Sequence, residues 1–123
     1  MKTTITILLM IIAIIHALPL SGFFGSRRLE NLYGIKINDN NLEILMRHRA
    51  VLFGLLAAIF GYAAFVPVVQ PFAFITAFFS ITSFSYLAFS VSEYNNAIQK
   101  VVYADIVAAV CLVLAIVLYI IGR

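Results

Sequence analysis

The chain has 123 residues, of which 64% are hydrophobic and 11% are charged, and its formal net charge is +3. A soluble domain carries roughly 25% charged residues, and a short chain cannot hide so much apolar surface in its own core because its surface-to-volume ratio is high. The composition therefore excludes an ordinary soluble domain and predicts an integral membrane protein. Its basic residues lie in loops that flank apolar runs, so nucleic acid is not expected as a partner.

Four apolar segments are long enough to cross a bilayer, which takes about 20 residues per helix. In hydrocarbon every backbone polar group must be bonded internally, so each segment is predicted to be an α-helix. The predicted membrane helices span residues 4–20, 41–65, 72–91 and 97–121. The fold class predicted for residues 1–123 is all-α: a single transmembrane domain that forms a four-helix bundle, with a polar loop and a short helix between the first two membrane helices.

The first apolar segment has two interpretations. Lys2, the apolar stretch 5–18 and the small residues Ser21 and Gly22 also fit a cleaved signal peptide. Against cleavage, no small-x-small site precedes Gly22. A retained helix would also supply the fourth member of a compact bundle. Both interpretations stay open at this point.

The longest polar stretch, residues 21–49, connects the first two membrane helices. Ser26–Tyr33 is predicted to be a short helix because its apolar residues share one face, and Gly34 is a suitable helix stop. Asn40 with Glu43 matches a capping box in which Asn replaces Ser or Thr. The second membrane helix is therefore expected to begin near residue 41.

Two further connections follow. Pro67 and Pro71 interrupt the apolar run, which predicts a tight antiparallel hairpin of the second and third membrane helices. Asn96 with Gln99 matches another capping box, before the last helix.

Lys and Arg residues set the predicted orientation, because they are enriched in cytoplasmic loops. The termini and the Pro67 turn hold only Lys2 and Arg123. The first and third connections hold Arg27, Arg28, Lys36, Arg47, Arg49 and Lys100. The predicted location is thus the cell inner membrane, with the first and third connections cytoplasmic and both termini outside.

The start of the second membrane helix carries the densest charge. Glu43 and Arg47 are four residues apart and can pair on one helix face. Small residues continue that face, and small residues let helices approach closely in lipid. The predicted helix-packing seam consists of Ala50, Gly54, Ala58 and Gly61.

Asp105 is the acidic residue of the last membrane helix. It lies nine residues past Asn96, just as Arg49 lies nine past Asn40, so the two side chains are expected at similar depth. A lone Asp in a membrane costs about 2.5–3.5 kcal/mol on insertion scales. The sequence therefore predicts an ion pair between Asp105 and Arg47 or Arg49.

Other polar residues approach the same membrane side from the first and third helices. The resulting polar network, or ligand gate, is predicted to contain His16, Glu43, Arg47, His48, Arg49, Tyr86, Ser90 and Asp105. The set lacks a nucleophile motif and a recognised metal spacing. No catalytic residue, metal site or cofactor is therefore predicted.

The third membrane helix places hydroxyl groups near one face, among many phenylalanines. These hydroxyls belong to Thr76, Ser80, Ser83 and Ser90. One interpretation is that they form hydrogen bonds to neighbouring helices. The alternative is an aromatic-lined pocket for a flat lipophilic ligand such as a quinone or a sterol-like lipid.

Residues 43–56, EILMRHRAVLFGLL, together with Leu32–Ile35 before them, resemble a group of small bacterial membrane proteins. The arrangement also resembles the DoxX-like four-helix families, in which a polar loop precedes a helix that opens on an Arg followed by small residues. Some members of the first group are labelled pantetheine-phosphate adenylyltransferase. The soluble enzyme of that name uses a His-x-Gly-His motif, from which residues 47–50, RHRA, depart.

Two functional hypotheses follow. The first is a non-enzymatic accessory or assembly factor of a membrane complex, with membrane lipids, other membrane-protein subunits or a second copy of the chain as partners. The second is a binder or transporter of a lipophilic small molecule, a quinone or lipid, with a polar gate at His16, Arg47 and Asp105. An enzyme that acts on a lipid or quinone is the least favoured alternative.

Overall fold

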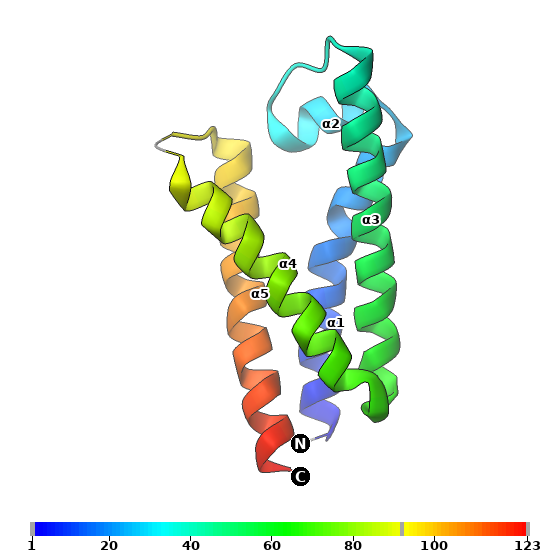
Figure 1. Ribbon diagram of the computed structural model, residues 1–123, viewed down its shortest axis with the longest axis vertical. Coiled ribbons are helices and arrows are strands. Elements are labelled where there is room, and N and C mark those ends of the chain that lie inside the picture. Colours follow the sequence, from blue (N-terminus) through cyan, green and yellow to red (C-terminus); the bar gives the residue numbers. More distant parts are fainter. Residues whose placement is uncertain (1, 92, 123) are drawn as a thin grey trace.

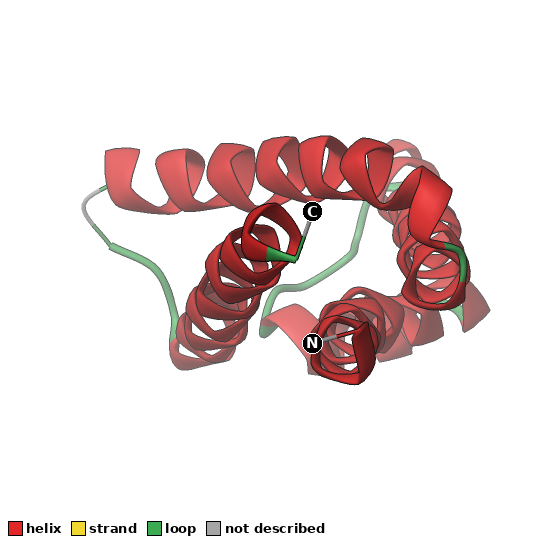
Figure 2. Cartoon of the chain, turned by 90° about the horizontal axis from the view of Figure 1, so that it is seen from below, coloured by secondary structure: helices red, strands yellow, loops and turns green. Residues whose placement is uncertain are grey.

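The computed structural model describes residues 2–91 and 93–122, so Arg123, which entered the orientation count, lies outside the described residues. All regular structure in the described part is helical, as Figure 2 shows. Four helices are long and apolar enough to cross a membrane. The predicted all-α class is therefore confirmed, and the architecture fits a multi-pass membrane protein.

The helices follow one another with short connections (Figure 1). The elements are α1 (Lys2–Ala17), the 3₁₀ helix η1 (Leu18–Phe24), α2 (Ser26–Tyr33), α3 (Asn40–Phe65), the 3₁₀ turn η2 (Pro67–Val69), α4 (Gln70–Ser90) and α5 (Asn96–Ile121). The first α-helix ends at Ala17, earlier than predicted, because Pro19 lacks a backbone donor and disfavours α geometry at Leu18. The chain continues the span as η1.

The four long helices form a ring. Helix α1 packs against α3 and α5, and α4 packs against α5 and, less extensively, α3. Figure 1 shows α4 crossing the bundle obliquely after the η2 turn, so that it leaves α3 and approaches α5. The turn is tight and the two helices run in opposite directions, as predicted. They contact each other less extensively than a close hairpin would, because α4 leaves α3 after the turn, and α1 is the main neighbour of α3.

The core lies along the inner faces of these helices. Leu9 and Ile12 of α1 and Phe60 of α3 are fully buried. From α4 and α5, alanines such as Ala77 and Ala108 line the inside, and small residues let helices approach closely in lipid. Helix α1 thus supplies part of this core.

Both long helices that follow polar loops begin one residue earlier than the capping boxes predict. Asp39, not Asn40, caps α3, because its carboxylate accepts a hydrogen bond from Asn41 N at 2.9 Å. Asn95, not Asn96, caps α5, because its side-chain oxygen accepts from Ile98 N at 2.8 Å. An N-cap residue needs extended backbone geometry, which Asp39 and Asn95 have.

The short helix α2 has the predicted bounds and ends at Gly34, whose φ of 65° is a left-handed conformation that favours glycine. Asn95 holds this end in place. Its Nδ2 donates to Tyr33 O at 2.8 Å and to Gly34 O at 3.1 Å. The residue that caps α5 therefore also fixes α2 over the same end of the bundle.

Only part of the predicted packing seam lies at a helix interface. Ala50 is buried, and a Cβ added at Gly54 would lie 2.8 Å from a methyl group of Leu20. Ala58 is exposed, because eight residues rotate a helix about 80° away from the face of Ala50. A Cβ added at Gly61 would meet nothing within 4 Å. The seam prediction is thus wrong for Ala58 and Gly61.

Candidate functional site

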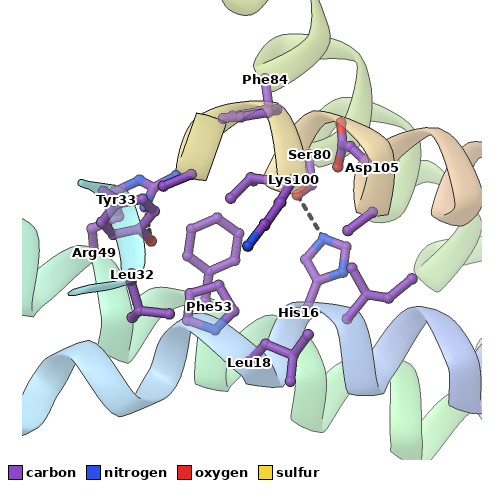
Figure 3. Close-up of a pocket in the computed structure, with 15 residues that line it drawn as sticks. His16, Leu18, Leu32, Tyr33, Arg49, Phe53, Ser80, Phe84, Lys100 and Asp105 are labelled. Carbon is purple, nitrogen blue, oxygen red and sulfur yellow. Dashed lines mark hydrogen bonds between the residues drawn. The ribbon is translucent and has the colours of Figure 1, made fainter. Parts of the chain in front are cut away.

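A cavity of about 220 Å³ lies at the charged end of the bundle (Figure 3). Side chains from α1, η1, α2, α3, α4 and α5 line it, and most of the wall is apolar. Its polar lining consists of His16, Tyr33, Arg49, Ser80, Lys100 and Asp105. The cavity therefore combines apolar walls with a small set of hydrogen-bonding and charged groups.

His16 and Ser80 form a hydrogen bond across the bundle, between α1 and α4. His16 is buried, and its Nε2 lies 2.9 Å from Ser80 Oγ. Its Nδ1 lies 2.9 Å from Ile12 O, which can only accept, so Nδ1 carries a proton. In the neutral ring Nε2 then accepts from the Ser80 hydroxyl. This bond orients both polar groups at the inner wall of the cavity, as the dashed line in Figure 3 shows.

Asp105 forms no ion pair with Arg47 or Arg49 among the described residues, so this prediction is wrong. Its Oδ2 accepts a hydrogen bond from Ser85 Oγ at 2.9 Å. The carboxyl group is buried, and it lines the cavity that Arg49 also lines. Figure 3 places Asp105 and Arg49 on opposite sides of that cavity.

Arg49 is held by aromatic groups. Its guanidinium lies 4.5 Å from the ring centroid of Phe53 and 5.3 Å from that of Tyr33, and its Nη1 donates to Tyr33 Oη at 2.6 Å. Arg47 turns away and donates to Phe23 O at 2.8 Å. The predicted Glu43–Arg47 pair is not formed, because the Arg47 side chain follows η1 instead of its own helix.

Lys100 lines the cavity, whereas its only predicted role was to help set the membrane orientation. Figure 3 shows its side chain directed into the space between Phe53 and His16. The spacing of Lys100 along α5 could have predicted this position. Lys100 shares one helix face with the other cavity-lining residues of α5, which are Ala97, Val101, Ala104 and Asp105. Tyr33 and Phe53 also line the cavity and were absent from the predicted network.

Five predicted network members lie outside the cavity lining, namely Glu43 and Arg47 together with His48, Tyr86 and Ser90. Tyr86 is 72% exposed, His48 is exposed, and Ser90 is exposed and donates to Leu87 O on its own helix. Of the hydroxyls predicted to bond across helices, Ser80 does so. Thr76 and Ser83 donate within α4, to Phe72 O and Ser80 O, so the prediction is wrong for these two residues and for Ser90.

The cavity can hold a small amphiphilic molecule, with its polar part at the cations and hydrogen-bonding groups. Across the described residues no three His, Cys, Asp or Glu side chains come together to hold a metal ion. Comparisons of the chain with protein-family models, with curated proteins and with solved structures find no match. The chemistry of the cavity is therefore the basis for a functional proposal.

Proposed function

We propose that this protein is a multi-pass inner-membrane protein that binds a lipophilic small molecule in the cavity at its charged end. The observation that carries the proposal is a volume of about 220 Å³ with mainly apolar walls and a polar lining. His16 and Asp105, which are both buried, line it, and buried ionisable groups within membrane helices typically mark functional sites.

The wall chemistry also supports a ligand that is apolar over most of its surface. Small-molecule sites are typically apolar clefts with a few polar groups that fix orientation. A quinone or a lipid fits this description. His16, Arg49 and Lys100 would contact its polar part, and Phe53 and Phe84 its apolar part.

Native mass spectrometry of the protein released from mild detergent tests this proposal. We expect a stoichiometric small molecule on the wild-type protein. Ala104→Phe fills the cavity and should remove it, whereas Ala58→Phe adds the same volume on an exposed face and should not. Absence of any small molecule from the wild-type protein, with a stoichiometric protein partner in its place, would contradict the proposal and support the accessory or assembly role.

The orientation is proposed from the distribution of Lys and Arg, with the first and third connections in the cytoplasm. Single cysteines in a Cys111→Ser background test it, with a membrane-impermeant maleimide on intact cells. Val68→Cys in the η2 turn, where the native side chain is 83% exposed, should react, and Lys36→Cys should not. The reverse pattern would overturn the orientation and leave the ligand proposal intact. The likeness to DoxX-like families stays a prediction.

A further inference from the structure

A groove between α3 and α4 continues from the cavity. It has a volume of about 460 Å³ and shares Arg49, Phe53, Ser80 and Phe84 with the cavity wall. Its remaining lining is mostly apolar and comprises Leu52, Leu56, Thr76, Phe79, Ser83 and Leu87. The groove exists because α4 diverges from α3 after the η2 turn (Figure 1).

The volumes indicate how far a ligand extends. Ligand pockets typically measure about 300–1,000 Å³. The cavity alone, at about 220 Å³, falls below that range, and the groove at about 460 Å³ falls within it. A ligand with its polar part in the cavity would therefore extend past Arg49 into the groove. From Arg49 to Leu56 the groove follows α3 for about 10 Å.

The junction of cavity and groove carries positive charge. Arg49 lines both spaces, and its described partners are the Tyr33 hydroxyl and two aromatic rings, none of which is anionic. The ammonium group of Lys100 points into the cavity (Figure 3). Asp105, the acidic residue of the cavity lining, is bonded to Ser85. Within the described part of the chain, neither cation has a carboxylate partner.

We propose that the ligand is a lipid with an anionic head group, which binds between Arg49 and Lys100 while its apolar chain lies in the α3–α4 groove. This inference rests on the proposed function and names the class of molecule. A chain that moves from the bilayer to an apolar groove gains little hydrophobic free energy, because the bilayer is equally apolar. The head group must therefore supply most of the affinity, and its charge must decide selectivity.

To test this proposal, the protein is delipidated and then reconstituted in nanodiscs of zwitterionic lipid. Native mass spectrometry measures how tightly each lipid probe binds to it. The probes are hexadecanoic acid, hexadecan-1-ol with the same chain and no charge, and a lysophosphatidic acid. We expect at least one anionic probe to bind about 10-fold or more tightly than the alcohol, since a hydrogen bond to a charged group contributes about that factor. Preference for the acid or for the lysophosphatidic acid identifies the head group as carboxylate or phosphate, and either preference supports the proposal.

Variants identify the cations that bind the head group. Arg49→Gln and Lys100→Gln should each reduce binding of the preferred anion about 10-fold and leave the alcohol unchanged. The matched control is Arg47→Gln, two residues away on α3, because Arg47 contacts Phe23 O and lies outside the cavity lining. An equal loss in the Arg47 variant, or no loss in the other two, would overturn the assignment.

Fatty acids of different chain length test whether the apolar chain lies in the α3–α4 groove. Thr76→Phe narrows the groove at its end away from Arg49, so binding of hexadecanoic acid should weaken while binding of hexanoic acid, whose chain is too short to reach that end, is unaffected. An equal effect on both acids would overturn the chain placement. If a small molecule co-purifies and Ala104→Phe removes it, yet acid and alcohol bind equally, the head-group inference fails and the proposed function stands. If no probe binds and nothing co-purifies, both fail.

Discussion

Asn95 connects α5 to the end of α2 through three hydrogen bonds, so its removal should destabilise the protein more than loss of an ordinary helix cap. Its side chain caps α5 through Ile98 N and donates to Tyr33 O and Gly34 O at the end of α2. We predict that Asn95→Ala lowers the free energy of unfolding by about 2.5 kcal/mol. Of this, about 1 kcal/mol comes from the cap, about 1 from the part-buried bond to Tyr33 O, and about 0.5 from the exposed bond to Gly34 O.

Two further variants separate these contributions. Asp39→Ala removes only the cap of α3, because the Asp39 side chain accepts its hydrogen bond from Asn41 N of that same helix. This substitution should cost only about 1 kcal/mol. Asn95→Asp keeps a capping oxygen but has no amide to donate, so it should lose about 1.5 kcal/mol. Equilibrium unfolding by SDS in mixed micelles measures these differences, and hydrogen exchange should locate the loosening in α2.

Two results would refute this reasoning. Equal destabilisation by Asn95→Ala and Asp39→Ala would mean that the bonds to α2 contribute nothing. Wild-type stability of Asn95→Asp would mean the same. The effect also bears on the cavity, because α2 supplies Tyr33, whose hydroxyl accepts from Arg49.

Four other substitutions test the packing by the same unfolding assay. Ser80→Ala removes the partner of His16 Nε2 and should cost about 0.6–1.7 kcal/mol, the range for hydrogen bonds between membrane helices; no change would contradict the bond. Phe60→Ala empties a fully buried site that contacts the His16 ring and should cost about 3–5 kcal/mol. Its control is Phe79→Ala, at 66% exposure, which should change stability by less than about 0.5 kcal/mol. Similar losses of stability in the two variants would show that Phe60 does not belong to the core. Gly34→Ala should cost about 1–2 kcal/mol because of its left-handed backbone, and unchanged stability would argue against that conformation.

The helices were predictable because the bilayer imposes a strong rule, namely that long apolar runs must bond their own backbones. The ends of α2 and α3 were also predictable, because Gly34 and Pro67 end a helix through their own backbone properties. The caps were displaced by one residue because Asp39–Asn40–Asn41 and Asn95–Asn96 each contain several residues able to cap. Only the backbone geometry decides which of them does so.

The cavity was only partly predictable. Membrane depth can be read by counting residues from helix starts, and it correctly brought His16, Arg49 and Asp105 to one cavity. Rotation about each helix axis is less well determined, which is why Tyr86 and His48 were assigned to the network although both are exposed. The order of helices around the ring is not encoded by periodicity at all. The divergence of α4 from α3, which opens the groove, therefore had no sequence signal.

Ring order also explains why Asp105 and Arg49 do not pair, and this gives a last prediction. Helices α3 and α5 lie diagonally in the ring. With neighbouring axes 8–10 Å apart, diagonal axes are about 13 Å apart, and the cavity occupies the space between them. Charges at equal depth thus face each other across the cavity.

Asp105→Asn tests this arrangement, because the amide oxygen of Asn can still accept the hydrogen bond from Ser85. We predict a change in the free energy of unfolding below about 0.5 kcal/mol. Asp105→Leu is the comparison: it deprives Ser85 of its partner and should cost about 1 kcal/mol. Breaking a buried ion pair costs about 3–5 kcal/mol. A loss of that size in Asp105→Asn would therefore mean that an arginine does bind Asp105, and that the cavity between them is closed by the pair.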